Sequence, residues 1–279
     1  MSQTRDETIR NRLAKMTGWA EERRRFMADH PNELKEDWYI RIGGNGYRAV
    51  SLACERPLLG FVSGSTTDIE KVVSHFHSER RNTPDRPTPE KCAQAWLIKQ
   101  AINNRLNLKT CLGLDGSIYD ELLFALDEVS FGDRNQGPIE RLDILAVGKS
   151  NGKAFPVFIE LKSERSLGQL IKQLDKYQRQ VKRYEGEFKK LLHACTSIKV
   201  DLSEYGRIMV WPKRTSDRRS DRRSDRIEDK CAKHKVTVIE SDTDSWIESD
   251  TDSWKCIRDF SFHPLNNKVY PPTPYIGES

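Results

Sequence analysis

The Asn151-Gly152 pair constrains the fold of this chain more than any other feature of its sequence. A type I′ hairpin turn needs positive φ at both central residues, and Asn-Gly is the pair that adopts it most readily. With these residues at the centre of a hairpin, Asp143 falls directly opposite Glu160. Side chains alternate between the two faces of a strand, so Lys162 shares the face of Glu160. The turn thus predicts two carboxylates about 5 Å apart at Cβ, with a lysine beside them.

Two carboxylates this close repel each other unless a cation lies between them. Mg²⁺ is typically held by one or two carboxylates together with waters and phosphate oxygens. A metal so held lowers the pKa of its bound water and neutralises charge on a phosphodiester. The alternative is a solvated strand face with ordinary cross-strand charge pairs. The adjoining positions Leu145 and Phe158 are apolar, which favours a functional site over that alternative.

The pattern downstream of residue 88 alternates between helices and strands. Thr88-Pro89-Glu90 begins a helix with an N-cap hydroxyl and a proline in the first turn. Apolar runs then predict strands, and apolar stripes at three- and four-residue spacing predict helices. The predicted strands are 122–131, 139–147, 155–162, 205–211 and 235–240, and the predicted later helices are 166–193 and 216–232. The order αβββαβαβ predicts an α/β fold.

Three motifs in these elements resemble those of a known family. Asp143 in one strand and Glu160-x-Lys162 in the next resemble the active-site pattern of the PD-(D/E)XK nuclease superfamily. Gln173-x-x-x-Tyr177 in the following helix resembles the Q-x-x-x-Y motif of RecB-like nucleases, and the set is similar to the NucS/EndoMS nuclease domain. The match covers about residues 89–240. It implies a restriction-endonuclease-like αβββαβ core, with a central mixed sheet flanked by helices.

The resemblance also implies a metal site. Asp143 and Glu160 would hold Mg²⁺, with Mn²⁺ as a substitute and with help from the carbonyl of Leu161. A further carboxylate would come from Glu90 in the first core helix or from Glu128 on the preceding strand. The six cysteines include no C-x-x-C pair, so neither zinc nor an iron–sulfur cluster is expected. Reduced thiols in a cytoplasmic protein are the simplest account of them.

The remaining motif residues receive roles from the same resemblance. Lys162 would assist the nucleophile or stabilise the pentavalent phosphate. Gln173 and Tyr177 would support the site or touch the phosphate backbone, the alternative being a polar helix edge with a half-buried tyrosine. Leu142 stands where the superfamily usually has a proline before its aspartate.

Basic residues follow the motifs along the same helix. Rows of cations bind nucleic acid because neutralising phosphates releases counterions. A solvated helix face is the alternative, and it is favoured for the arginines of 214–226, which alternate with aspartates. The expected nucleic-acid-binding residues are Gln169, Lys172, Lys176, Arg179, Lys182 and Arg183. DNA is favoured over RNA as the partner.

The first 85 residues are expected to form a small α+β accessory or recognition domain. Its first 30 or so residues have helical spacing, and two β-rich runs around Gly43-Gly44-Asn45-Gly46 predict a hairpin. The proline- and arginine-rich segment 78–89 is interpreted as a linker, so residues 86–279 would form the nuclease domain. Residues 239–246 are repeated without change as 247–254, which indicates an insertion after the last strand.

The sequence therefore predicts a Mg²⁺-dependent endonuclease that hydrolyses DNA in restriction, repair or defence. Two alternatives stay open: a catalytically inactive nucleic-acid-binding member, and a nuclease subunit that acts only within a larger assembly. A homodimer is also left open. No apolar run approaches the roughly 20 residues that a membrane span needs, so no membrane partner is expected.

Overall fold

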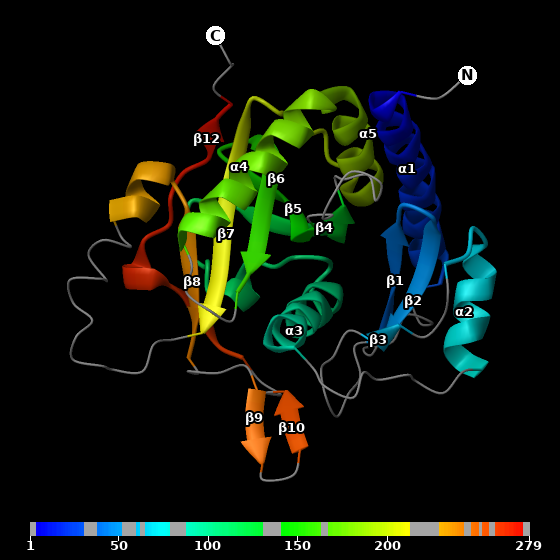
Figure 1. The fold of residues 1–279 in the computed structure, drawn as a ribbon, viewed down its shortest axis with the longest axis horizontal. Coiled ribbons are helices and arrows are strands. Elements are labelled where there is room, and N and C mark those ends of the chain that lie inside the picture. The colour runs from blue at the N-terminus through cyan, green and yellow to red at the C-terminus, as the bar shows by residue number, and fades with distance from the viewer. Residues whose placement is uncertain are drawn as a thin grey trace.

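The computed structural model describes residues 4–30, 38–51, 60–61, 65–78, 88–130, 141–162, 167–212, 229–242, 247–250, 253–256 and 260–275. Its described strands form a seven-stranded mixed sheet flanked by helices, which confirms the predicted α/β class (Figure 1). The order across the sheet is β11-β8-β7-β6-β5-β4, and β12 pairs with β7. The strands are β4 (Glu121–Ser130), β5 (Arg141–Ser150), β6 (Lys153–Leu161), β7 (Glu204–Pro212), β8 (Thr237–Ser241), β11 (Phe262–Pro264) and β12 (Thr273–Pro274).

The direction of the strands changes at the middle of the sheet. β4, β5 and β6 form an antiparallel meander, whereas β7 and β8 run parallel to β6. Antiparallel strands can be joined by a tight turn, while a parallel neighbour needs a crossover, which here contains two helices. The short strands β11 and β12 pair antiparallel with β8 and β7, and the sequence pattern did not predict them.

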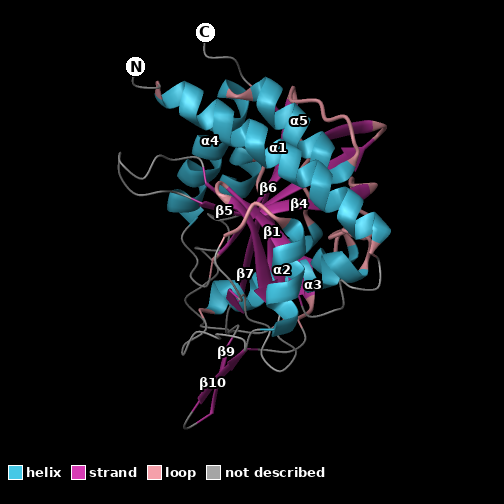
Figure 2. Cartoon of the chain, turned by 90° about the vertical axis from the view of Figure 1, so that its right-hand side faces the viewer, coloured by secondary structure: helices cyan, strands magenta, loops and turns pink. Residues whose placement is uncertain are grey.

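Two hydrophobic clusters hold the helices on the sheet. α3 (Pro89–Asn103) contributes Trp96 and Leu97 to one cluster, which also contains Ile144 and Ile159. α1 (Arg5–Asp29), α4 (Leu167–Arg183) and α5 (Glu185–Thr196) contribute to the other, which contains Leu145 and Phe158. Figure 2 shows the three helices α1, α4 and α5 together at one end of the view. Alternating strand residues thus face opposite cores, as the strand period requires.

The single helix predicted over 166–193 is wrong, because the structure has two helices there. The break is at Tyr184, whose backbone leaves the helical region with φ −113° and ψ 40°. The Tyr184 ring is buried, and its hydroxyl donates to Asp6 at the start of α1, 3.0 Å away. The break lets α5 lie along α1, where Arg24 donates to the carbonyl of Ala194 (Figure 1).

The N-terminal elements pack into the same core as the sheet. β1 (Trp38–Gly43) and β2 (Gly46–Ser51) form the predicted hairpin, and β3 (Gly60–Phe61) and α2 (Ile69–Ser78) follow. Ile9 and Leu13 of α1 belong to the hydrophobic cluster that contains Leu145 and Phe158. The guanidinium of Arg23 is buried and donates to the carbonyls of Ile40 on β1 and Ala125 on β4. Most of the predicted linker, residues 79–87, lies outside the described residues.

The two copies of the eight-residue repeat both begin in a strand, but the two strands belong to different sheets. The first copy begins within β8 of the main sheet. The second begins β9 (Ile247–Asp250), which pairs only with β10 (Ser253–Cys256) among the described strands (Figure 1). The helix predicted over 216–232 is described only from residue 229, and residues 229–234 are helical. The repeat at 216–226 lies outside the described residues. None of the described helices is long and apolar enough to cross a membrane.

One cysteine differs from the expectation of reduced thiols. Cys92 on α3 is fully buried and disulfide-bonded, and its partner is not among the side chains that the structure describes. Cys111, Cys195 and Cys231 are not disulfide-bonded. The absence of closely spaced cysteines argues against a metal cluster, but a disulfide joins residues without regard to their spacing along the chain.

Candidate active site

The hairpin turn sets the register that forms the site. Asn151 and Gly152 both have positive φ, 49° and 74°, as a type I′ turn requires. The pairing then runs from Ser150 opposite Lys153 to Ile144 opposite Ile159. This register confirms the predicted one, and its next position is Asp143 opposite Glu160.

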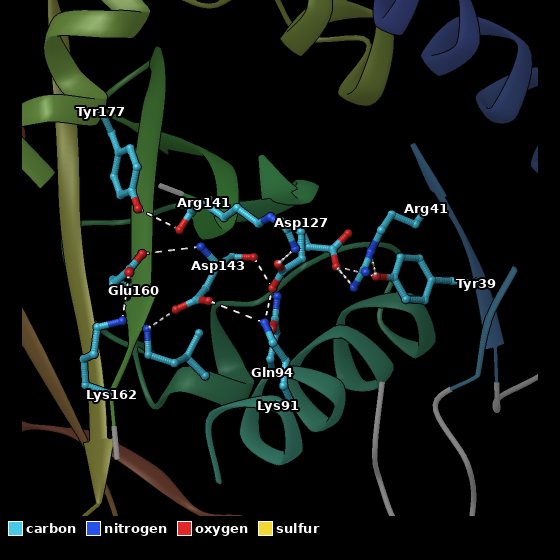
Figure 3. Close-up of polar contacts among 12 residues, drawn as sticks. Tyr39, Arg41, Lys91, Gln94, Asp127, Arg141, Asp143, Glu160, Lys162 and Tyr177 are labelled. Carbon is cyan, nitrogen blue, oxygen red and sulfur yellow. Dashed lines mark hydrogen bonds and ion pairs between the residues drawn. The ribbon is translucent and has the colours of Figure 1, made fainter. Parts of the chain in front are cut away.

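Asp143 and Glu160 lie side by side where the ladder ends. The Asp143 amide donates to Glu160 Oε2 at 3.4 Å, and the Leu161 amide donates to Asp143 Oδ2 at 2.9 Å (Figure 3). The two acidic residues are only 9% and 1% exposed. A solvated strand face would leave such side chains in water, so the structure excludes that alternative.

Burial changes the acidity of both carboxyl groups. Loss of solvent raises the pKa of Asp143 above its ordinary range, to about 6. Loss of solvent, followed by the nearby charge of Asp143, raises the pKa of Glu160 to about 8. Both shifts mean that the ionised pair is unfavourable here, because a buried charge needs a compensating partner. A bound cation would provide that compensation.

Lys162 supplies one positive charge to this pair. Its Nζ lies 3.0 Å from Glu160 Oε1, and its amide donates to the Val210 carbonyl of β7. Burial opposes the charge of the ammonium, but the carboxylates of Glu160 and Asp143 outweigh it, so the pKa of Lys162 is raised. Lys162 therefore remains cationic, as the predicted role requires.

The two candidates for a third carboxylate differ in their surroundings. Glu90, half-buried in the first turn of α3, is close enough to Lys162 to add to the rise in its pKa. Glu128 forms an ion pair with Lys91, and its Oε2 lies 3.5 Å from Arg141. Burial raises the pKa of Glu128, but the charge and hydrogen bond of Lys91, the charge of Arg41 and a hydrogen bond from Gln94 together outweigh it, so the net shift is downward.

The backbone of β4 is irregular beside the site. The pairing of β4 with β5 shifts between Phe124 and Leu126, which marks a bulge at Ala125. Glu128 follows with φ 51°, a left-handed conformation that side chains other than glycine adopt rarely. Such strain persists where the surrounding structure enforces it, often at functional sites.

Sequence reasoning missed Lys91 and Gln94, which α3 brings to the site. Lys91 Nζ donates to Gln94 Oε1 at 2.7 Å and lies 3.8 Å from Asp143 Oδ1. Gln94 is fully buried and donates from Nε2 to the carbonyl of Asp143 at 2.8 Å (Figure 3). The available signal was their spacing, since residues i and i+3 share a helix face. Lys91 and Gln94 are polar residues next to the buried Cys92 and Ala93, and this pattern indicates a polar site.

A second missed group comes from the N-terminal hairpin. Arg41 and Tyr39 of β1 both contact the carboxylate of Asp127, which directly precedes Glu128 (Figure 3). All three side chains are buried. Removing one partner of such a pair leaves an uncompensated charge, so β1 is a structural requirement of the site.

The two Q-x-x-x-Y residues both lie on α4. Tyr177 is buried, and its hydroxyl donates to the carbonyl of Arg141 at 2.6 Å, two residues before Asp143. Gln173 is half-buried one helical turn earlier. The hydroxyl of Tyr177 therefore holds the beginning of β5, which fits the supporting role rather than contact with a substrate.

The predicted basic row lies on the exposed side of α4. Two of its members already form ion pairs: Lys182 with Glu185 at 2.7 Å, and Arg183 with Asp6 at 2.8 Å. Gln169 lies within α4, but its side chain is outside the described part of the structure. The exposed members are Lys172, Lys176, Arg179, Lys182 and Arg183. The row presents cations to solvent, and part of its charge is neutralised.

The donor set at the site fits Mg²⁺. Among the described residues, no group of three or more His, Cys, Asp or Glu side chains is arranged to hold a metal ion. Asp143 and Glu160 offer two carboxylates, and Mg²⁺ commonly uses one or two together with waters and phosphate oxygens. Comparisons with known proteins add nothing to this reading, since no family model, curated protein or solved structure matches the chain.

Proposed function

We propose that this chain is a Mg²⁺-dependent endonuclease that hydrolyses phosphodiester bonds of DNA, with a restriction-endonuclease-like core. The observation that carries the proposal is the buried pair of Asp143 and Glu160, with the ammonium of Lys162 3.0 Å from Glu160. The expected αβββαβ order is present as α3, β4, β5, β6, α4 with α5, and β7.

The raised pKa values of the two carboxyl groups support a binding role over a structural one. An acidic pair that served only stability would be placed where its ionised form is favourable. Here burial opposes ionisation of both Asp143 and Glu160. Shifts of this kind cluster at functional sites, because the charge of ionisable groups in a binding site is compensated only when the partner binds.

Each side chain of the site has its own role in hydrolysis. When bound by Asp143 and Glu160, Mg²⁺ supplies charge neutralisation at the phosphate and a water of lowered pKa. The Leu161 amide fixes the orientation of Asp143 through Oδ2. The ammonium of Lys162 can donate to the attacking water or to a phosphate oxygen while it remains paired with Glu160. The hydroxyl of Tyr177 holds the strand that carries Asp143.

The exposed face of α4 is the proposed path of the nucleic-acid backbone. α4 is the next element after β6, so its basic row comes soon after the strand that carries Glu160 along the chain. Phosphate contacts position a duplex without reading its sequence. We therefore assign backbone binding to the exposed cations of this row, Lys172, Lys176, Arg179, Lys182 and Arg183.

Digestion of supercoiled plasmid by the purified chain tests the proposal. Wild type is expected to cut with Mg²⁺ or Mn²⁺ and not with EDTA, whereas Asp143→Ala and Lys162→Ala should not cut. Lys149→Ala is the matched control, because Lys149 lies on β5 but pairs with Glu121, 2.6 Å away, toward the other end of the strand. Equal activity of wild type and Asp143→Ala would refute the active site. A parallel arm with single-stranded RNA tests the preference for DNA.

A further inference from the structure

Lys91 occupies a defined position between two carboxylates of the site. Its ammonium forms an ion pair with Glu128 and lies 3.8 Å from Asp143 Oδ1 (Figure 3). A third contact, to Gln94 Oε1 at 2.7 Å, fixes the end of the side chain. Gln94 in turn donates to the backbone of Asp143, so α3 holds the lysine and the aspartate in one hydrogen-bonded unit.

The two oxygens of Asp143 face different neighbours. Oδ2 accepts from the Leu161 amide on β6, on the side of Glu160 and Lys162. Oδ1 faces Lys91 and, beyond it, Glu128. In two-metal nucleases a pair of cations lies about 3.5–4 Å apart, and both contribute to the clamp on the phosphate. A second cation here would be held by Asp143 Oδ1 and Glu128, where the ammonium of Lys91 already lies.

The conformation of Glu128 shows that this arrangement is enforced. Its φ of 51° within a strand is unfavourable for a glutamate, and its side chain is only 12% exposed. The neighbouring Asp127 is held by Arg41 and Tyr39, so the N-terminal hairpin fixes the backbone that carries Glu128. Glu128 is thus held next to the proposed metal ligand Asp143 and already forms an ion pair with Lys91. It therefore needs no second cation.

We propose that Lys91 takes the place of a second metal ion, so that the site binds a single divalent cation; this inference rests on the proposed function. The ammonium of Lys91 compensates the negative charge of Glu128 and of Asp143 Oδ1. Only the pair of Asp143 and Glu160 is then left to hold a metal. Lys91 is thus a specificity-determining residue that sets the number of bound cations.

Counting bound Mn²⁺ by the loss of its free electron paramagnetic resonance signal tests this inference without any measurement of activity. Wild type should bind one Mn²⁺ per chain, and Asp143→Ala should bind none. Lys91→Met should bind two, because the ammonium that lies between Glu128 Oε1 and Asp143 Oδ1 is then gone and a second ion can take its place. The double variant Lys91→Met/Glu128→Gln should return to one. Lys99→Met, two helical turns along α3, is the charge-matched control and should bind one.

Each outcome decides the inference. A wild-type count of two, or a count of one for folded Lys91→Met, overturns it and leaves the proposed nuclease in place. A wild-type protein that binds no Mn²⁺ overturns the proposed function as well. If Lys91→Met fails to fold, shown by circular dichroism, Lys91→Gln replaces it, since an amide can still bond to Gln94 while carrying no charge.

Discussion

Replacing Asp143 by asparagine is expected to stabilise the metal-free protein near pH 8, although it removes a proposed metal ligand. The carboxyl group is 9% exposed, and burial raises its pKa from 3.8 to about 6. A raised pKa means that the folded state holds the proton more tightly than the unfolded state does. The ionised carboxylate therefore weakens folding as pH rises from about 4 through about 6, and it does so fully above that range.

The magnitude follows from this shift. Two pKa units at about 1.4 kcal/mol each give a penalty of about 3 kcal/mol at pH 8 and almost none below pH 4. The asparagine keeps an oxygen for the Leu161 amide, so the 2.9 Å hydrogen bond survives the substitution. Removing the charge also eases the ionisation of Glu160, whose pKa the Asp143 carboxylate raises. The melting temperature should rise by roughly 5–10 °C at pH 8.

Urea unfolding in EDTA, followed by circular dichroism at about pH 4 and about pH 8, measures this effect. The difference in unfolding free energy between Asp143→Asn and wild type should be large at the higher pH and small at the lower. A variant less stable than wild type at pH 8 would refute the reasoning. It would show that the carboxylate is a satisfied structural group and not one that awaits a cation.

Three further predictions concern the surroundings of the site. Mg²⁺ should raise the melting temperature more near pH 8 than near pH 5, because protons compete for both carboxylates; a pH-independent rise, measured by scanning fluorimetry, would contradict this. Tyr177→Phe should cost about 1–3 kcal/mol in urea unfolding, because the buried carbonyl of Arg141 loses its donor; an unchanged midpoint would argue against that hydrogen bond. Arg41→Met should cost about 3–5 kcal/mol, and adding Asp127→Leu should recover most of it. Additive losses in that double-mutant cycle would show that the pair is not coupled.

The acidic pair could be predicted from the sequence because one local feature determines it. The Asn151-Gly152 turn fixes the register of β5 against β6, and strand alternation then decides which side chains meet. Neither step depends on the rest of the molecule. The hairpin of β1 and β2 could likewise be predicted from two local β-rich runs around a glycine-rich turn.

The remaining parts of the site depend on tertiary packing, which a local sequence pattern does not predict. Lys91 and Gln94 meet Asp143 only because α3 packs against the sheet. Arg41 reaches Asp127 from a hairpin 86 residues away in the chain. The break between α4 and α5 was missed because the apolar spacing continues across Tyr184, whose backbone leaves the helix to suit its buried ring. Elements of two or three residues, such as β11 and β12, are too short to show any periodicity.

Cleavage of a labelled DNA duplex by wild type and Asp143→Asn, from the same preparations used for unfolding, tests the central claim most directly. Because the variant is expected to be the more stable protein, loss of its activity cannot be assigned to misfolding. The account predicts Mg²⁺-dependent cleavage by wild type and a rate lower by at least about 100-fold for Asp143→Asn. Cleavage by the variant at the wild-type rate, or no Mg²⁺-dependent cleavage by wild type, would contradict it.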